Sequence, residues 1–330
     1  MTLSQASALT QCVDTPAIKT LDLSEAGMAN LITFGEGQRQ RYLNNAPFPH
    51  IVIDNLFPKA LLEDVLKDIQ NLEHPVLKNF YATAHKYSTP DPQIMGPTAR
   101  RFLIDLCSAR FCRFLEALTG IEGVIPDPHF EGGGVHEISR GGFLKMHTDF
   151  NWHKKLKLDR RLNMLIYLNQ GWQESWGGHL ELWDSEMQSQ FVKIPPTFNK
   201  TVIFSTTDYS YHGHPNPLEC PEGISRRSLA LYYYSNGRPK EEVQFFQSAG
   251  TNYQERPGEI FLPTQKPSKK ASPKAGQKTG QKTGQKMSQP VATSRRRALT
   301  LQQSMKKKLK RKLPKPLIEI YKAGKRSLRG

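Results

Sequence analysis

Apolar residues recur at helical spacing in two segments of the first third of the chain. Residues 58–72 (PKALLEDVLKDIQNL) begin with proline, which the first turn of a helix tolerates. Residues 97–120 (PTARRFLIDLCSARFCRFLEALTG) predict a second helix, with Gly120 as its stop. Ahead of both, residues 47–57 (PFPHIVIDNLF) are typical of a strand that ends in a turn, and residues 73–97 show no regular pattern.

From about residue 121 the pattern changes to short runs that are rich in β-branched, aromatic and leucine residues. Clusters of Gly, Pro, Asn and Asp separate these runs, which are GGGVHEI, FLKMHTD, LNMLIYL, GHLELWD, TVIFST and SLALYYY. Short strands at such spacing predict a sandwich, barrel or jelly roll. Because the helices come first and the strands later, the expected fold class is α+β, without βαβ alternation.

The two ends of the chain differ from this body. Residues 1–45 are polar and weakly periodic, which predicts a lead-in with some helix. Residues 263–298 form a low-complexity basic linker with a GQKT repeat and little to bury, so we expect disorder there. Residues 299–330 form a basic tail that we expect to be partly helical until Pro314.

The positive charge behind the net +16 is concentrated in the linker and the tail together. Residues 266–330 carry 21 of the 46 Lys and Arg side chains and a single acid, which leaves the rest of the chain at −4. Binding of nucleic acid, the ribosome or an anionic membrane surface is therefore expected only of the tail. A solvated tail without a partner is the alternative.

The four cysteines are expected to be free thiols in a reducing cytosol. The first twenty residues lack the basic start and apolar centre of a signal peptide. No run reaches the ~18 apolar residues of a membrane span. We therefore expect a cytoplasmic location.

Candidate chemistry begins in the stretch KMHTDFNWH, where His147 and Asp149 lie two residues apart. On an extended backbone such residues point to the same face. The pair could therefore hold a metal ion, or it could form an ordinary polar turn. Arg160 and Arg161, which follow, are expected on a turn before a core strand.

A second set of polar residues follows the run TVIFST. His212 and His214 lie in YSYHGHPNP, and the strand SRRSLALYYYS opens with Arg226, Arg227 and Ser228. A mononuclear non-haem iron site uses two imidazoles and one carboxylate and leaves the remaining positions open. An arginine binds a carboxylate through two hydrogen bonds and keeps its charge. Ser228 shares a strand face with Arg226 and could add a hydroxyl hydrogen bond, whereas Arg227 points the other way.

The ordered set HTD, GGHLELW, YHGHP and RRS resembles the 2-oxoglutarate and Fe(II)-dependent dioxygenase superfamily, and most of all its prolyl 4-hydroxylase-like branch. PFPHIVIDNLF and RRLNMLIYLNQGW are also similar to that branch. The resemblance covers residues 46–240 and implies a double-stranded β-helix (jelly-roll) core with N-terminal supporting helices. We place the dioxygenase domain at residues 46–262.

Residue by residue, the resemblance implies that His147, Asp149 and His212 bind the iron and form the catalytic centre. It implies that Arg226 binds the distal carboxylate of 2-oxoglutarate and that Tyr167 hydrogen-bonds to this co-substrate. The implied cofactor is Fe(II), with 2-oxoglutarate and O2 as co-substrates and ascorbate as a further candidate.

Two choices stay open at this point. The gap between His212 and Arg226 is longer than in many members of the superfamily, which leaves Arg227 as an alternative anchor. His214 is an alternative to His212, and is otherwise expected to orient the turn or to face the substrate.

The function expected from the resemblance is hydroxylation of an unactivated carbon, with a prolyl residue in a peptide or protein as the first substrate class. A free amino acid or small metabolite is the second. A non-catalytic scaffold that acts through its basic tail on nucleic acid or ribosomes is a third hypothesis. The presence of all three metal-binding residues and an arginine favours the enzyme.

Overall fold

The computed structural model describes residues 13–14, 24–73, 76–239 and 248–259. Four α-helices and two short 3-10 helices lie among them, at α1 (Glu25–Asn44), α2 (Lys59–Ile69), η1 (Pro92–Ile94), α3 (Pro97–Leu106), α4 (Ala109–Thr119) and η2 (Glu174–Trp176). The strands that precede the long central strand are β1 (Val13–Asp14), β2 (His50–Asp54), β3 (Val76–Phe80), β4 (Thr83–Thr89) and β5 (Ile125–Pro126). The rest are β6 (Gly134–Thr148), β7 (Trp152–His153), β8 (Leu158–Tyr167), β9 (Leu180–Trp183), β10 (Gln190–Ile194), β11 (Lys200–Ser205), β12 (His212–His214), β13 (Ser225–Ser235) and β14 (Asn252–Tyr253).

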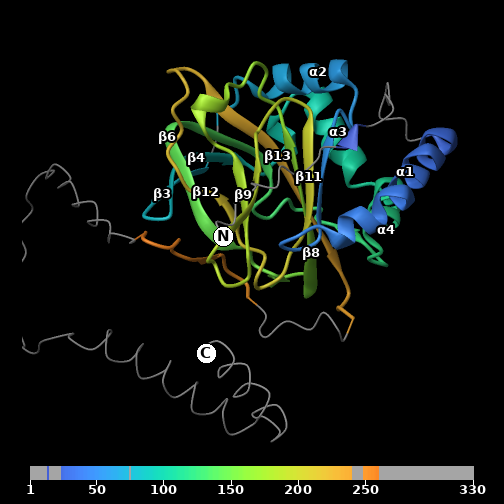
Figure 1. Ribbon diagram of the computed structural model, residues 1–330. Coiled ribbons are helices and arrows are strands. Elements are labelled where there is room, and N and C mark those ends of the chain that lie inside the picture. Colours follow the sequence, from blue (N-terminus) through green and yellow to red (C-terminus); the bar gives the residue numbers. More distant parts are fainter. Residues whose placement is uncertain (1–12, 15–23, 74–75, 240–247, 260–330) are drawn as a thin grey trace, which may run out of the picture. The chain divides into compact units, whose positions relative to one another are not determined.

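The strands form one curled sheet whose main path runs β1-β2-β11-β8-β13-β6-β12-β9-β10. Every pairing is antiparallel except that of β1 with β2. The long strand β6 links the two halves of the curl, since its first half pairs with β13 and its second half with β12. The ribbon in Figure 1 shows the sheet folding over on itself around this strand. The predicted α+β fold with a jelly-roll core is confirmed.

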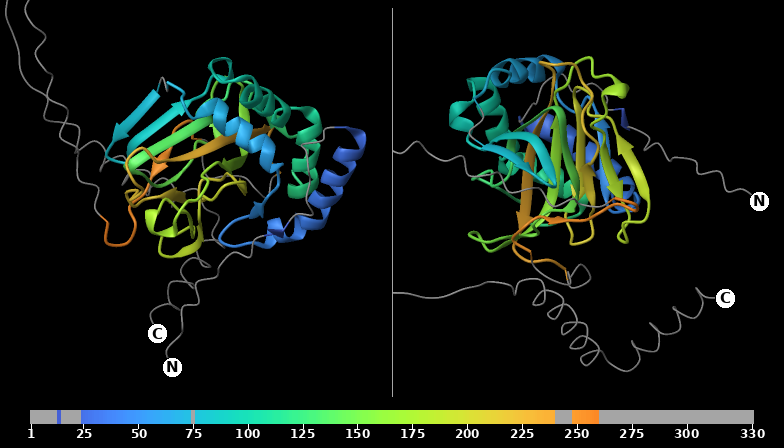
Figure 2. Two further views of the ribbon diagram at one scale, coloured as in Figure 1. Left: turned by 90° about the horizontal axis from the view of Figure 1, so that it is seen from above. Right: turned by 90° about the vertical axis from the view of Figure 1, so that its left-hand side faces the viewer.

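Alternation along the strands divides the core into two layers. In β2, Ile51 and Ile53 belong to the cluster that packs against the helices, whereas Val52 belongs to a second cluster with Tyr167 and Leu182. The helices cover one outer side of the curled sheet, as both views in Figure 2 show. The other face of the sheet is therefore free to enclose a site.

The helix predicted over residues 97–120 is wrong in one respect, because it is two helices. The chain leaves α3 at Cys107, and the hydroxyl of Ser108 accepts a hydrogen bond from the Phe111 amide at 3.2 Å, which begins α4. A serine in this capping position favours a new helix start over a continuous helix. Gly120 ends α4 in the left-handed conformation, at φ 73°, as predicted.

The segment at residues 73–97 contains β3 and β4, although its pattern predicts no regular structure. β4 alternates poorly between apolar and polar residues, and it forms because it pairs with both β3 and β6. The runs GGGVHEI and FLKMHTD, which we predict as two strands, join into the single strand β6. Helix α1 falls within the predicted lead-in and packs against α4, so it belongs to the same compact unit as the sheet.

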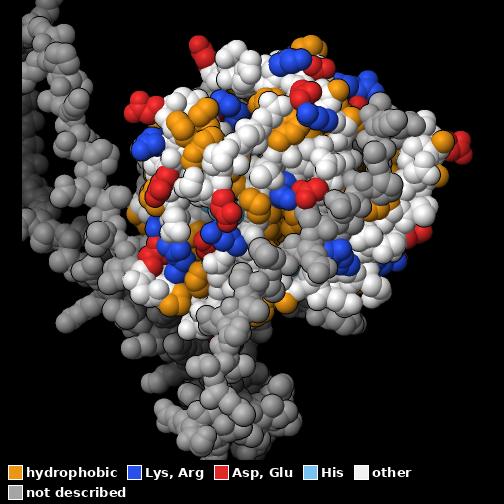
Figure 3. All heavy atoms as spheres, turned by 45° about the horizontal axis from the view of Figure 1, so that its top comes forward, with side chains coloured by type: hydrophobic (Ala, Val, Ile, Leu, Met, Phe, Trp, Pro, Cys, Tyr) orange, Lys and Arg blue, Asp and Glu red, His pale blue; other side chains and the backbone are white. Residues whose placement is uncertain are grey.

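The predictions for the linker at 263–298 and the tail at 299–330 lie outside the described residues. Within the described part of the chain, no helix has the length and apolar character that a bilayer crossing requires. On the face drawn in Figure 3, acidic and basic side chains are intermixed, as expected for a body whose net charge is small.

Candidate metal centre

Three predicted ligands come together where β6 ends and β12 begins. His147 is near the end of β6, Asp149 follows directly after it, and His212 opens β12 opposite His147. One ligand atom from each residue lies within 4.8 Å of the other two. Nε2 of His212 is 3.3 Å from Oδ2 of Asp149, and Nε2 of His147 is 3.7 Å from Oδ1. In the described residues this is the one group of three such side chains that could hold a metal ion.

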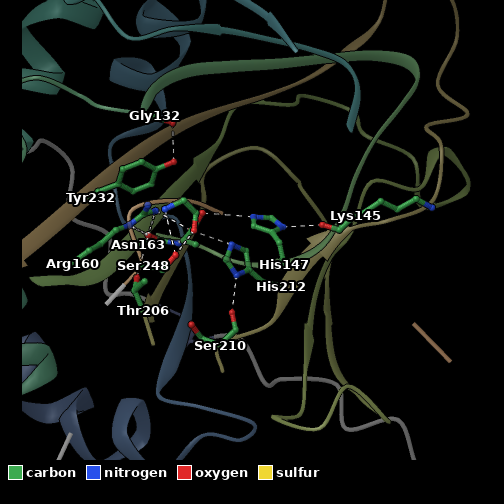
Figure 4. A network of polar contacts seen from close by, with 12 residues as sticks. Gly132, Lys145, His147, Arg160, Asn163, Thr206, Ser210, His212, Tyr232 and Ser248 are labelled. Carbon is green, nitrogen blue, oxygen red and sulfur yellow. Dashed lines mark hydrogen bonds and ion pairs between the residues drawn. The ribbon is translucent and has the colours of Figure 1, made fainter. Parts of the chain in front are cut away.

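Both imidazoles are oriented through their other ring nitrogen. Nδ1 of His147 donates to the carbonyl of Lys145 at 2.8 Å, and Nδ1 of His212 donates to the carbonyl of Ser210 at 2.9 Å. Figure 4 shows the two rings turned toward the same point with these carbonyls behind them. Burial and the neighbouring His212 lower the pKa of His147 to about 3. His147 is therefore neutral, with the Nε2 lone pair available to a metal.

The carboxylate of Asp149 is oriented from behind by two residues of β8. Oδ2 accepts hydrogen bonds from Nη2 of Arg160 at 2.9 Å and from Nδ2 of Asn163 at 2.7 Å. The Arg160 guanidinium lies between two rings, at 3.4 Å from the Tyr232 centroid and 4.4 Å from that of Phe150. Burial pushes the pKa of Asp149 upward, but Arg160 and His212 outweigh it and hold that pKa well below its usual range. The group is therefore a fixed anion.

The donor set fits a ferrous ion. Two neutral imidazoles and one carboxylate are the ligands of mononuclear non-haem iron, and together they occupy one face of the metal. The hydrogen bonds that the two Nδ1 atoms donate and that Oδ2 accepts are the outer contacts that such ligands need to stay in place.

A cavity of about 70 Å³ extends from the three ligands into the curl of the sheet. Arg226 and Ser228 of β13 line it, together with Lys86 of β4 and His214 of β12. Arg226 is 4% exposed, and no acidic side chain among the described residues forms an ion pair with it. The cavity therefore combines a metal-binding group with a buried, uncompensated guanidinium.

Arg226 is held by two neighbours. Its Nε donates to the carbonyl of Gly178 at 2.7 Å, and Nη2 donates to the hydroxyl of Tyr167 at 3.1 Å. A Cβ at Gly178 would lie 3.0 Å from Cδ of Arg226 and 2.6 Å from a methyl of Leu218, so glycine is what permits this approach. The Tyr167 hydroxyl thus contacts the arginine directly, although Tyr167 itself does not line the cavity.

The structure separates the alternatives that the sequence leaves open. Arg227 points to the other face of β13, where its Nε and Nη2 each lie 3.1 Å from the carboxylate of Glu137. His214 lines the cavity but is not one of the three clustered residues. Burial, followed by Arg226 and Lys86, lowers the pKa of His214 well below its usual value, so this imidazole is neutral.

The positions of Arg160, Arg161 and Lys86 in the structure are not predicted from the sequence. The expectation that Arg160 and Arg161 lie on a turn is wrong, because both are buried within β8. Lys86 is 9% exposed and belongs to a strand that the sequence pattern does not predict. The available signal was two adjacent arginines at the start of an apolar run, which is an unusual place for a charge unless it is paired.

A second cavity of about 200 Å³ is lined by two of the three ligands, His147 and Asp149. It shares Lys86, Leu144, His147, Asp149 and Tyr232 with the first cavity, and the rest of its wall includes Phe150 and Tyr253. Strand β14 forms part of this wall by pairing with the end of β6, opposite Thr148 and His147. His147 and Asp149 therefore border both cavities, whereas His212 borders only the first.

Comparison with known proteins agrees with this geometry. The model of the 2OG-Fe(II) oxygenase superfamily matches residues 133–234, the segment that contains all three clustered residues and Arg226. This segment of the chain is therefore similar to the 2OG-Fe(II) oxygenase superfamily. The match runs from the start of β6 almost to the end of β13, the strands that build the cavity.

A curated protein to which the chain is similar is the prolyl 3-hydroxylase OGFOD1 of Mus musculus, 25% identical over 210 residues. That match covers 62% of this chain and 36% of the mouse protein, so the chain spans little more than a third of its relative.

Solved structures with a similar fold include a prolyl 4-hydroxylase from Phytophthora capsici (17% identity, TM-score 0.47, 67% of this chain and 70% of that one). Another is a prolyl hydroxylase from Trichoplax adhaerens in complex with a peptide of the hypoxia inducible factor. It is 15% identical with a TM-score of 0.44, and the match covers 64% of this chain and 94% of that one.

Proposed function

We propose that the protein is an Fe(II)- and 2-oxoglutarate-dependent dioxygenase that hydroxylates a prolyl residue in a peptide or protein. The observation that carries this proposal is the shared cavity of His147, Asp149, His212 and Arg226. Metal ligands alone would fit many reactions. A buried guanidinium in the same cavity, without an acidic partner in the described part of the chain, adds a site for a dicarboxylic acid.

Each residue has a distinct task in this proposal. His147, Asp149 and His212 hold Fe(II), and Arg226 binds the distal carboxylate of 2-oxoglutarate. Tyr167 supports Arg226 through a 3.1 Å hydrogen bond and would contact the same carboxylate in this proposal. When bound, Fe(II) with 2-oxoglutarate and O2 supplies oxidative decarboxylation to succinate and carbon dioxide, coupled to insertion of one oxygen atom into a C–H bond. The narrow, buried walls keep bulk water from the reacting atoms.

Support for a prolyl substrate comes from the second cavity. Phe150, Tyr232 and Tyr253 line it, and aromatic faces suit an apolar ring such as that of proline. Arg160 also lines it, and its Nη1 is buried without a hydrogen-bond partner among the described residues. A peptide carbonyl is an acceptor that would satisfy this donor. The identity shared with a prolyl 3-hydroxylase points to the same substrate class.

The test begins with the full chain, Fe(II) and 2-oxoglutarate under anaerobic conditions. Binding of the keto acid to the metal should produce a weak visible charge-transfer absorbance, which Arg226→Met should weaken and Arg227→Met should not. Air and a library of proline-containing peptides should then give succinate together with a mass increase of one oxygen atom. NMR of the product decides between the 3 and 4 positions of the ring.

Two results would change the proposal. Succinate formation that depends on a free amino acid or another small molecule, and not on peptides, would replace the substrate class and keep the chemistry. The absence of both the absorbance and succinate would reject the enzyme altogether.

A further inference from the structure

His214 occupies a place that neither the metal centre nor the Arg226 contacts explain. Its side chain is 3% exposed and lines the cavity that holds both. Both of its ring nitrogens are buried, and neither has a hydrogen-bond partner in the described residues. A neutral imidazole carries one N–H donor and one acceptor, and leaving a buried donor unpaired is unfavourable.

Three other buried histidines among the described residues are fixed in a common way. Nδ1 of His147, His212 and His50 each donates to the carbonyl two residues earlier, at 2.8, 2.9 and 2.8 Å. His214 makes no such bond, although it lies on a strand of the same kind. A histidine with a purely structural role is expected to have such a partner. Both ring nitrogens of His214 are therefore available to a molecule that enters the cavity.

The sheet register places His214 between the two ends of the cavity. Along β6, His212 lies opposite His147, His214 lies opposite Leu144, and Arg226 lies opposite Ile138. Leu144 lies between His147 and Ile138 along β6, so His214 lies between His212 and Arg226 in register. The imidazole thus faces the cavity on the Arg226 side of the metal ligands.

We propose that His214 is a positioning residue for the co-substrate, whose N–H donates a hydrogen bond to the 2-oxoglutarate carboxylate bound by Arg226. This inference rests on the proposed function. Arg226 already uses Nε on the carbonyl of Gly178, so it cannot present its whole guanidinium to the ligand. A carboxylate has lone pairs for several donors, and Ser228 and His214 line the cavity beside the arginine.

The test compares two keto acids that differ only at the distal end. The full chain, loaded with Fe(II) under anaerobic conditions, is titrated with 2-oxoglutarate and with 2-oxopentanoate, which lacks the distal carboxylate. The visible absorbance of the bound keto acid reports the Kd, and the iron content is measured in parallel. The variants are His214→Leu, His214→Gln and the control His50→Leu, a buried histidine that does not line the cavity.

We expect His214→Leu to raise the Kd of 2-oxoglutarate about tenfold and that of 2-oxopentanoate less than about twofold, at unchanged iron content. His214→Gln keeps an N–H donor and should recover most of the lost 2-oxoglutarate affinity. If the leucine variant does not fold, the Kd values of His214→Gln for the two keto acids are compared with those of the wild type instead. His50→Leu should leave both Kd values unchanged.

Equal 2-oxoglutarate affinity in His214→Leu and the wild type would overturn this inference, as would equal weakening of both keto acids. The proposed function fails separately, if the wild type binds neither keto acid.

Discussion

Nη2 of Arg160 lies 2.9 Å from Oδ2 of Asp149, and this contact joins the structural core to the metal centre. Arg160 has no exposed surface, and its guanidinium is stacked between the rings of Phe150 and Tyr232. The arginine thus neutralises a carboxylate that must remain ionised, and it fixes the direction in which that carboxylate faces. Without metal, the pair is a buried ion pair whose partners depend on each other.

Arg160→Met should destabilise the protein by about 3 to 5 kcal/mol, because it leaves the carboxylate of Asp149 without its cation. Urea denaturation of the metal-free protein measures the loss. The matched control is Arg227→Met, which breaks the pair with Glu137, a contact that is partly exposed to solvent. The control should cost about 1 kcal/mol or less. Equal losses of unfolding free energy in the two variants would show that the buried pair stabilises the protein no more than the partly exposed pair does.

Asp149→Asn should abolish tight iron binding while the fold persists. The amide keeps an oxygen that can accept from Arg160, but it loses the negative charge that holds the metal. We expect the iron affinity to fall more than about 100-fold, since even outer contacts of metal ligands are worth 10- to 100-fold. Competition with a coloured chelator measures this affinity, and far-UV circular dichroism checks the fold. Retention of iron by the variant would remove Asp149 from the ligand set.

Arg226→Met should raise the KM for 2-oxoglutarate about 10- to 100-fold, since a charge-assisted hydrogen bond to a carboxylate is worth about 1.5 to 3 kcal/mol. Arg227→Met should leave this KM unchanged, because Arg227 binds Glu137 on the opposite face of β13. Succinate formation at increasing 2-oxoglutarate concentrations separates the two variants. The reverse ranking would exchange the roles of the two arginines.

The residues that the sequence identifies are those whose position follows from strand periodicity. His147 and Asp149 are two apart, and so are Arg226 and Ser228, and in the structure each pair faces the cavity. Register brings His212 opposite His147, which the sequence could only suggest through resemblance.

Arg160 and Lys86 were harder to find, because their roles depend on contacts between strands far apart in the chain. Arg160 of β8 contacts Tyr232 of β13, and Lys86 lies on a strand that exists only through its pairing with β3 and β6. Local pattern carries no information on either contact. The break between α3 and α4, in contrast, has a local signal in the sequence. Ser108 is a residue type that favours a helix N-terminus, and it lies within an otherwise continuous helical pattern.

The stability of the metal-free protein should fall as the pH drops below about 6.5, the value of a histidine in the unfolded chain. Burial lowers the pKa of His50, and the hydrogen bond to the Phe48 carbonyl offsets this only in part. On lowering the pH, the unfolded state therefore binds a proton before the folded state does. The free energy of unfolding then decreases, by at most about 1.4 kcal/mol per pH unit for each such group.

Urea denaturation at about pH 7.5, 6 and 5 measures this dependence, and His50→Leu should make it shallower because one of the titrating groups is gone. Above about pH 7.5 the free energy of unfolding should depend on pH equally in the two proteins, since His50 is neutral there in both the folded and the unfolded chain. Only at acidic pH should the free energy of unfolding fall more steeply with decreasing pH in the wild type than in His50→Leu. An unchanged slope in His50→Leu would mean that His50 takes up its proton equally well in the folded and unfolded chains.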